Sequence, residues 1–136
     1  MGRRPLSRLL LDSTVVIDLL RQRRGAHERL RAAQVAGDDV YITAITAFEI
    51  TRGLKARERE PATRLFEGLL TADLGIGEGR LAGWWAQRYA ARGRTLSQAD
   101  LLIAAAAVGL GARLATANPK DFPMRDVLVE HWPPEP

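Results

Sequence analysis

The chain has 136 residues, of which 46% are hydrophobic, and its 20 Lys and Arg outnumber its 16 Asp and Glu to give a net charge of +4. This length and hydrophobic content predict a single domain over residues 1–136. Without cysteine there are no disulfides or thiolate metal sites, and no apolar run reaches the roughly 18 residues of a membrane span. We therefore expect a soluble cytoplasmic protein, and its positive charge favours a polyanionic partner.

The first half of the chain alternates between short apolar runs and longer segments with helical periodicity. Residues 8–12, "RLLLD", predict a buried strand whose last residue is Asp12, and residues 39–43 predict a second strand. Ser13 or Thr14 is a candidate cap for the helix that follows Asp12. Helices are predicted over residues 13–22, 26–36, 45–58 and 61–70, with Gly25 ending the first and Pro61 beginning the last.

The second half continues the alternation. A short strand is expected near residues 71–75, and two further strands in "ARLATAN" and "DVLVEHW". Helices are predicted over residues 80–93 and 97–111, the second with an alanine-rich face suited to close packing on a sheet. Alternating strands and helices predict an α/β fold of three layers, α/β/α, around a mostly parallel sheet of four to five strands.

Acidic and amide side chains recur just after the predicted strands. Asp12 ends the first strand, Glu49 follows the second, Asp100 opens a late helix, and Asn118 and Asp121 follow the fourth strand. Because ligands of parallel sheets bind at the carboxyl ends of the strands, these side chains are expected to lie at one edge of the sheet.

Helix capping is the alternative explanation for most of these acids. An acid at the third helical position after a hydroxyl or amide residue is typical of an N-cap. The pattern occurs three times, with Thr46 before Glu49, Ser97 before Asp100, and Asn118 before Asp121. Asp12 is the acid that capping explains least, because a carboxylate after a buried strand requires a cation, donors or water. Several converging carboxylates would also suit Mg²⁺ or Mn²⁺, so the two explanations can coexist.

Four segments, in this order, resemble the PIN-domain family, and within it the VapC-type toxins of bacterial toxin–antitoxin pairs. They are "LLLDSTVVIDLL", "ITAFEITRGL", "RTLSQADLLIAAAA" and "RLATANPKDF", and together they extend over nearly the whole chain. The resemblance implies a PIN-like fold and an endoribonuclease that hydrolyses RNA phosphodiester bonds with a water activated by Mg²⁺ or Mn²⁺. It also implies a homodimer and a VapB-type antitoxin as protein partner.

The resemblance assigns roles to individual residues. Asp12, Glu49 and Asp100 match the principal catalytic acids and metal ligands, and Asn118 falls where the family has a fourth acid, so it would be a weaker ligand without charge. The neighbours expected to support the ligands are Ser13, Thr116 and Asp121.

Basic residues near the acids are candidates for RNA contact. Arg92 and Arg94 precede the Asp100 helix in a loop that contains glycine, and Arg52 lies one helical turn beyond Glu49. For Arg52, an ion pair with Glu49 is the alternative. The aromatic residues Trp84, Trp85 and Tyr89 could stack on bases, although their helical spacing is more typical of a core or a subunit interface.

Two other readings remain open. A catalytically silent PIN-like domain that binds nucleic acid or a protein partner is consistent with Asn118 and the basic charge. A phosphatase or receiver domain also places an aspartate after its first strand. The second acid of the phosphatase pattern is replaced here by Thr14, and the receiver's adjacent acid pair is missing. No Walker-type "GK[ST]" motif occurs, which excludes a P-loop.

Overall fold

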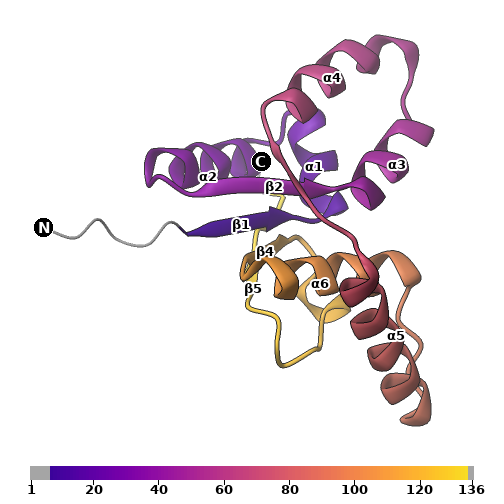
Figure 1. Cartoon of the computed structure of the whole chain (residues 1–136). Helices are drawn as coiled ribbons and strands as arrows, with labels where there is room; N and C mark the ends of the chain where they lie inside the picture. Colours follow the sequence, from indigo (N-terminus) through magenta and orange to yellow (C-terminus); the bar gives the residue numbers. More distant parts are fainter. Residues whose placement is uncertain (1–6, 135–136) are drawn as a thin grey trace, which may run out of the picture.

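A five-stranded, entirely parallel sheet forms the centre of the protein in the computed structural model, which describes residues 7–134 (Figure 1). Its strands are β1 (Arg8–Leu11), β2 (Asp39–Thr43), β3 (Leu70–Ala72), β4 (Arg113–Thr116) and β5 (Val129–His131). They lie in the order β3-β2-β1-β4-β5, so β1 is central. The predicted α/β fold with a parallel sheet is confirmed, with five strands.

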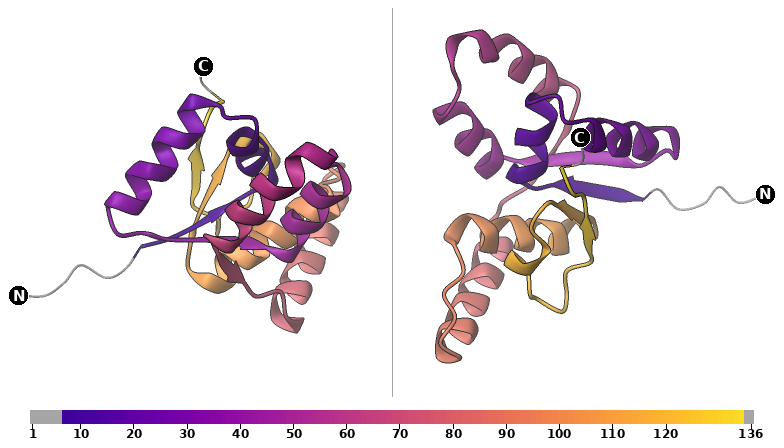
Figure 2. Two further views of the ribbon diagram at one scale, coloured as in Figure 1. Left: turned by 90° about the horizontal axis from the view of Figure 1, so that it is seen from above. Right: turned by 180° about the vertical axis from the view of Figure 1, so that it is seen from behind.

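Helices cover both faces of the sheet, as the two views of Figure 2 show. They are α1 (Ser13–Leu20), α2 (Arg24–Val35), α3 (Ala44–Arg52), α4 (Arg59–Glu67), α5 (Ile76–Ala91) and α6 (Gln98–Leu110), with short 3-10 helices η1 (Ala56–Glu58) and η2 (Pro119–Asp121). Because side chains alternate along a strand, β1 contributes to two cores. Leu9 and Leu11 pack with residues of α1 to α4, whereas Leu10 packs with α5 and α6.

The alanine-rich face of α6 packs as the sequence predicts. Ala104, Ala105, Ala106 and Ala107 are all buried in the core that α6 shares with the sheet. Small side chains bring this helix close to the strands, which positions its first turn beside the carboxyl edge of the sheet. No helix in the described part of the chain is both long and apolar enough to cross a membrane.

Several predicted helix boundaries are wrong. Asp12 does not end β1; it is the N-cap of α1, and neither Ser13 nor Thr14 caps that helix. Gly25 is buried inside α2 and does not end the preceding helix. Thr43, not Thr46, caps α3.

The other differences concern the later helices and the ends of the chain. Pro61 lies within the first turn of α4, which begins at Arg59. The helix predicted from residue 80 starts earlier, at Ile76. The single domain proposed for residues 1–136 includes residues 1–6, 135 and 136, which lie outside the described residues.

Candidate active site at the carboxyl edge of the sheet

Asp12 lies at the centre of the carboxyl edge of the sheet, where β1 meets α1. Only 3% of this residue is exposed to solvent. The Oδ1 atom accepts hydrogen bonds from Thr14 Oγ1 at 2.5 Å and from the Val15 amide at 3.2 Å. The Oδ2 atom accepts from Thr116 Oγ1 at 2.6 Å. Burial raises the pKa of Asp12, and these hydrogen bonds oppose the shift because they stabilise the charged form.

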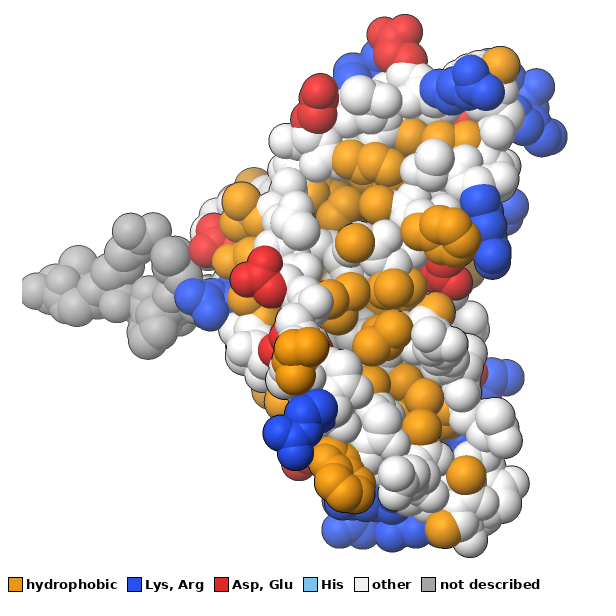
Figure 3. Space-filling model, turned by 45° about the vertical axis from the view of Figure 1, so that its right-hand side comes forward, with side chains coloured by type: hydrophobic (Ala, Val, Ile, Leu, Met, Phe, Trp, Pro, Cys, Tyr) orange, Lys and Arg blue, Asp and Glu red, His pale blue; other side chains and the backbone are white. Residues whose placement is uncertain are grey.

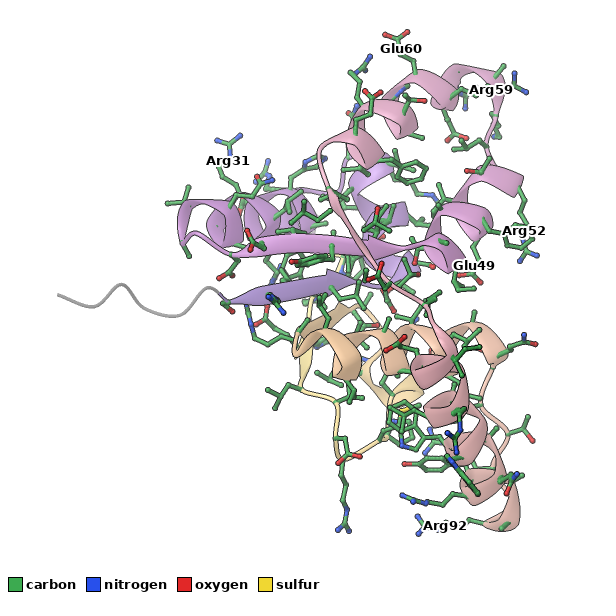
Figure 4. The ribbon with its side chains drawn as sticks, in the orientation of Figure 1. Arg31, Glu49, Arg52, Arg59, Glu60 and Arg92 are labelled. Carbon is green, nitrogen blue, oxygen red and sulfur yellow. The ribbon has the colours of Figure 1, made fainter. Side chains whose placement is uncertain are left out.

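Glu49 is oriented by a hydroxyl contributed by α1. Ser13 Oγ donates to Glu49 Oε1 at 2.6 Å and lies 3.0 Å from Thr46 Oγ1. Because the single Ser13 hydrogen goes to Glu49, Thr46 is the donor in the second contact. Figure 4 shows the Glu49 side chain on the side of α3 that faces α6. Ser13, which is expected to support a metal ligand, thus contacts Glu49.

The capping alternative for Glu49 is excluded by its position. Helix α3 begins at Ala44, so Glu49 lies in its second turn, beyond the positions at which an acid completes an N-cap. The sequence pattern indicates that capping explains Asp12 least. In the structure, however, Asp12 caps a helix and Glu49 does not.

Asp100 lies in the first turn of α6, where its backbone amide donates to Ser97 Oγ at 3.0 Å, so the predicted Ser97 cap is confirmed. Burial raises the pKa of Asp100, and the negative charges of Asp121, Asp12 and Glu49 raise it further, against the hydrogen bond with Ser97. Three carboxylates from other segments thus act on Asp100 at this edge. Asp121 has the strongest of the three charge effects on Asp100.

Asn118 is exposed, and its side chain makes no capping hydrogen bond to η2. Its backbone amide donates to Thr116 Oγ1 at 3.0 Å. The structure thus links Thr116 directly to Asp12, brings the Asp121 charge to Asp100, and leaves the Asn118 side chain without a described contact to the acids.

The three candidate arginines lie in different environments. The Arg52 guanidinium packs over the Phe48 ring at 5.3 Å, and no ion pair with Glu49 is present among residues 7–134. Arg94 donates to the Lys120 carbonyl at 2.6 Å, which ties the α5–α6 loop to η2. Arg92 is exposed, with its guanidinium 5.9 Å from the Tyr89 ring. Figure 4 shows Arg52 on α3 and Arg92 at the far end of α5, well separated.

Two polar residues at this edge are not among the predicted site residues. Thr14 hydrogen-bonds both Asp12 and the Ala117 amide, and the signal that could have indicated it is the "DST" sequence, which places its hydroxyl two residues beyond Asp12. Asp73 directly follows β3, but it is exposed and is not among the charges that shift the pKa of Asp100.

The chemistry of the donors suits a hard divalent cation. Carboxylate oxygens are the preferred ligands of Mg²⁺ and Mn²⁺, and the repulsion that raises the pKa of Asp100 is what such a cation would relieve. Within residues 7–134, no three acidic or histidine side chains are already close enough to hold a metal ion. The acidic side chains therefore suit a divalent cation in their charge and donor type. They would have to move closer together to coordinate it.

Comparisons with known proteins identify relatives along most of the chain. A family model described as "PIN domain" matches residues 9–127. Ribonuclease VapC19 of Mycobacterium tuberculosis is 30% identical over 119 residues, which cover 85% of this chain and 92% of that protein. Ribonuclease VapC10 of the same organism is 31% identical over 120 residues, covering 88% and 90%.

Solved structures share the fold. A toxin–antitoxin complex from Klebsiella pneumoniae contains a chain with a TM-score of 0.71 and 27% identity, covering 88% of this chain and 94% of that one. A DNA-bound VapBC from Salmonella typhimurium matches with a TM-score of 0.82 at 19% identity, covering 93% and 99%, and at that identity it shows the fold alone.

Proposed function

Because the chain belongs to the PIN domain family, we propose that it is a VapC-type toxin of a toxin–antitoxin pair and acts as a Mg²⁺- or Mn²⁺-dependent endoribonuclease. The observation that carries the proposal is the convergence of Asp12, Glu49, Asp100 and Asp121 at one edge of the sheet. The relatives named ribonuclease VapC support the reaction class. A cytoplasmic location stays a prediction.

Each acid has a distinct task in this proposal. Asp12 and Asp100 would hold the cation, supported by Glu49, whose carboxylate Ser13 orients. A bound divalent cation supplies positive charge that lowers the pKa of water and offsets the charge of the phosphodiester group. Asp121 adds negative charge beside Asp100, while Asn118 is retained as a weaker, uncharged ligand.

Arginines on both sides of the acids would hold the RNA backbone. Arg92 is exposed at the end of α5, and Arg52 is exposed on α3. Arg94 uses one nitrogen on the Lys120 carbonyl, and a guanidinium has further donors for a phosphate group. Their separation suits a backbone that crosses the acidic edge between them.

Protein partners are part of the same proposal. Large apolar side chains are exposed on α3, β3 and α5, namely Phe48, Leu70, Ile76 and Trp84. Figure 3 shows hydrophobic side chains gathered on this side of the molecule. Exposed apolar surface of this kind is typical of an interface, which supports a homodimer. A VapB-type antitoxin is supported by the toxin–antitoxin complex of 27% identity and by the relatives named ribonuclease VapC.

The decisive experiment measures cleavage of structured RNA by the purified protein with Mn²⁺, with Mg²⁺ and with excess EDTA. We expect cleavage with either ion, none in EDTA, and none for Asp12→Asn or Asp100→Asn. The matched control is Asp73→Asn, which neutralises an exposed carboxylate at the same edge outside the acid cluster. Undiminished cleavage in EDTA would exclude the metal-dependent reaction.

A catalytically silent PIN-like domain is the second candidate, and the uncharged Asn118 favours it. RNA binding that weakens with salt, without any metal-dependent cleavage, would support this alternative. Mn²⁺ affinity separates the two candidates, because a silent domain has no requirement for a metal at the acids.

A further inference from the structure

The two oxygens of Asp12 are held by hydroxyl groups from different parts of the chain. Thr116 comes from the end of β4 and donates to Oδ2. Thr14 comes from the first turn of α1 and donates to Oδ1 at 2.5 Å. Both hydroxyls also accept from consecutive backbone amides, since Ala117 N donates to Thr14 Oγ1 and Asn118 N donates to Thr116 Oγ1, each at 3.0 Å.

This pairing sets the direction of the Thr14 hydroxyl. A threonine hydroxyl has one hydrogen and two acceptor lone pairs. Because the Ala117 amide occupies the acceptor side, the single hydrogen is directed at Asp12. One side chain therefore joins the start of α1, the Asp12 carboxylate and the loop that leads to Asp121.

We propose that Thr14 is a positioning residue that holds the Asp12 carboxylate in the orientation required to bind a divalent cation, through its bridge between Asp12 Oδ1 and the Ala117 amide. The inference rests on the proposed function, because it assumes that Asp12 binds a cation. Without the hydroxyl, Oδ1 loses its shortest contact and retains backbone amide donors, of which Val15 N lies at 3.2 Å. Thr116 still holds Oδ2, so the carboxylate is fixed at one oxygen and less firmly oriented at the other.

The test compares Mn²⁺ affinity, measured by calorimetry on the full chain, among Thr14→Val, Thr14→Ser and the wild type. Valine preserves the shape of threonine but removes the hydroxyl, whereas serine keeps it. We expect Thr14→Val to bind Mn²⁺ about 10- to 100-fold more weakly, as is typical for lost hydrogen bonds to metal ligands. We expect Thr14→Ser to stay close to the wild type. The matched control is Thr63→Val, whose hydroxyl donates to the Arg59 carbonyl on exposed α4.

A second measurement does not depend on metal. Hydrogen exchange of the Ala117 amide should be faster in Thr14→Val, because that amide loses its acceptor, and unchanged in Thr14→Ser. Unchanged exchange at the amides elsewhere in the sheet and helices would show that the variant is otherwise folded. If Thr14→Val does not fold, the same comparison is made with Thr14→Ala.

The outcomes separate this inference from the proposed function. Unchanged Mn²⁺ affinity in Thr14→Val, or an equal loss in Thr14→Ser, would overturn the role of the hydroxyl. A wild type that binds Mn²⁺ but cleaves no RNA would refute the ribonuclease proposal alone, and the affinities would still decide on Thr14. A wild type with no Mn²⁺ affinity would overturn both.

Discussion

The two edges of the sheet differ in how their charged side chains are paired. At the amino edge, Arg113 donates to Asp38 at 2.7 Å, to Glu130 at 2.5 Å and to Ser7 at 3.2 Å. The second oxygen of Glu130 accepts from Trp132, which follows the other end of β5, at 2.6 Å. At the carboxyl edge, by contrast, none of the four clustered carboxylates forms an ion pair within residues 7–134.

The contrast distinguishes charge used for structure from charge available for binding. The amino edge joins β4, β5 and the turn before β2 through mutual compensation, so it has little capacity left for a ligand. The carboxyl edge concentrates negative charge and compensates it only with hydroxyl and amide donors. Acids whose pKa is raised by burial, as for Asp12 and Asp100, and that have no ion-pair partner among the described residues are typical of functional sites.

The largest effect is expected from neutralising the centre of the carboxyl edge. Asp12→Asn removes one ligand charge, so RNA cleavage with Mn²⁺ should fall by more than the roughly 100-fold seen when only a supporting hydrogen bond to a metal ligand is lost. The unfolding free energy should change little, because an amide is cheaper to bury than a carboxylate. Cleavage rates and urea unfolding measure the two quantities, and near-wild-type cleavage would remove Asp12 from the site.

A substitution at the amino edge should instead lower stability and leave metal binding unchanged. Arg113→Met removes two ion pairs and should lower the unfolding free energy by about 1–3 kcal/mol, because charged partners lose their hydrogen bonds. Mn²⁺ affinity should stay unchanged, because Arg113 lies at the other end of β4 from Thr116. A loss of metal affinity in a folded Arg113→Met protein would show that the edges are coupled.

A smaller, pH-dependent effect is expected at Asp100. Its folded-state pKa is raised above the ordinary 3.8 by burial and by neighbouring carboxylates, so the folded protein binds this proton more tightly than the unfolded chain does. Stability contributed by the protonated form is therefore present below pH 3.8 and is lost as the pH rises through the raised pKa.

Asp100→Asn should abolish this loss of stability with rising pH, because asparagine does not titrate. In EDTA, the stability of the variant relative to the wild type should increase as the pH rises through that window and then stay constant. Urea unfolding at a series of pH values measures the difference. A difference that is the same at every pH would contradict the assigned cause.

The smallest effect is expected for Arg92, which is exposed at the end of α5. Arg92→Ala should weaken RNA binding to a similar extent for different sequences and reduce the slope of log affinity against log salt by about one, as for loss of a single phosphate contact. Fluorescence anisotropy over a range of salt concentrations measures this slope. An unchanged slope would remove Arg92 from the RNA path.

Local patterns were sufficient to predict the architecture and one helix cap. Apolar runs and helical periodicity indicated the strand and helix alternation, and Ser97 was recognised as the cap of α6. These features depend on residues within a few positions of one another. The same patterns failed where two hydroxyl or acidic candidates stood close together, as at Asp12 against Ser13, and at Thr43 against Thr46.

The sequence by itself thus determined the fold class and the order of the acids along the chain. Only the tertiary structure decided which groups meet: Ser13 with Glu49, Thr14 with the Ala117 amide, and the Asp121 charge with Asp100. The physical reason is chain separation. These contacts join different segments, up to 103 positions apart for Thr14 and Ala117, and they exist only because parallel pairing brings the ends of β1, β2 and β4 to one edge.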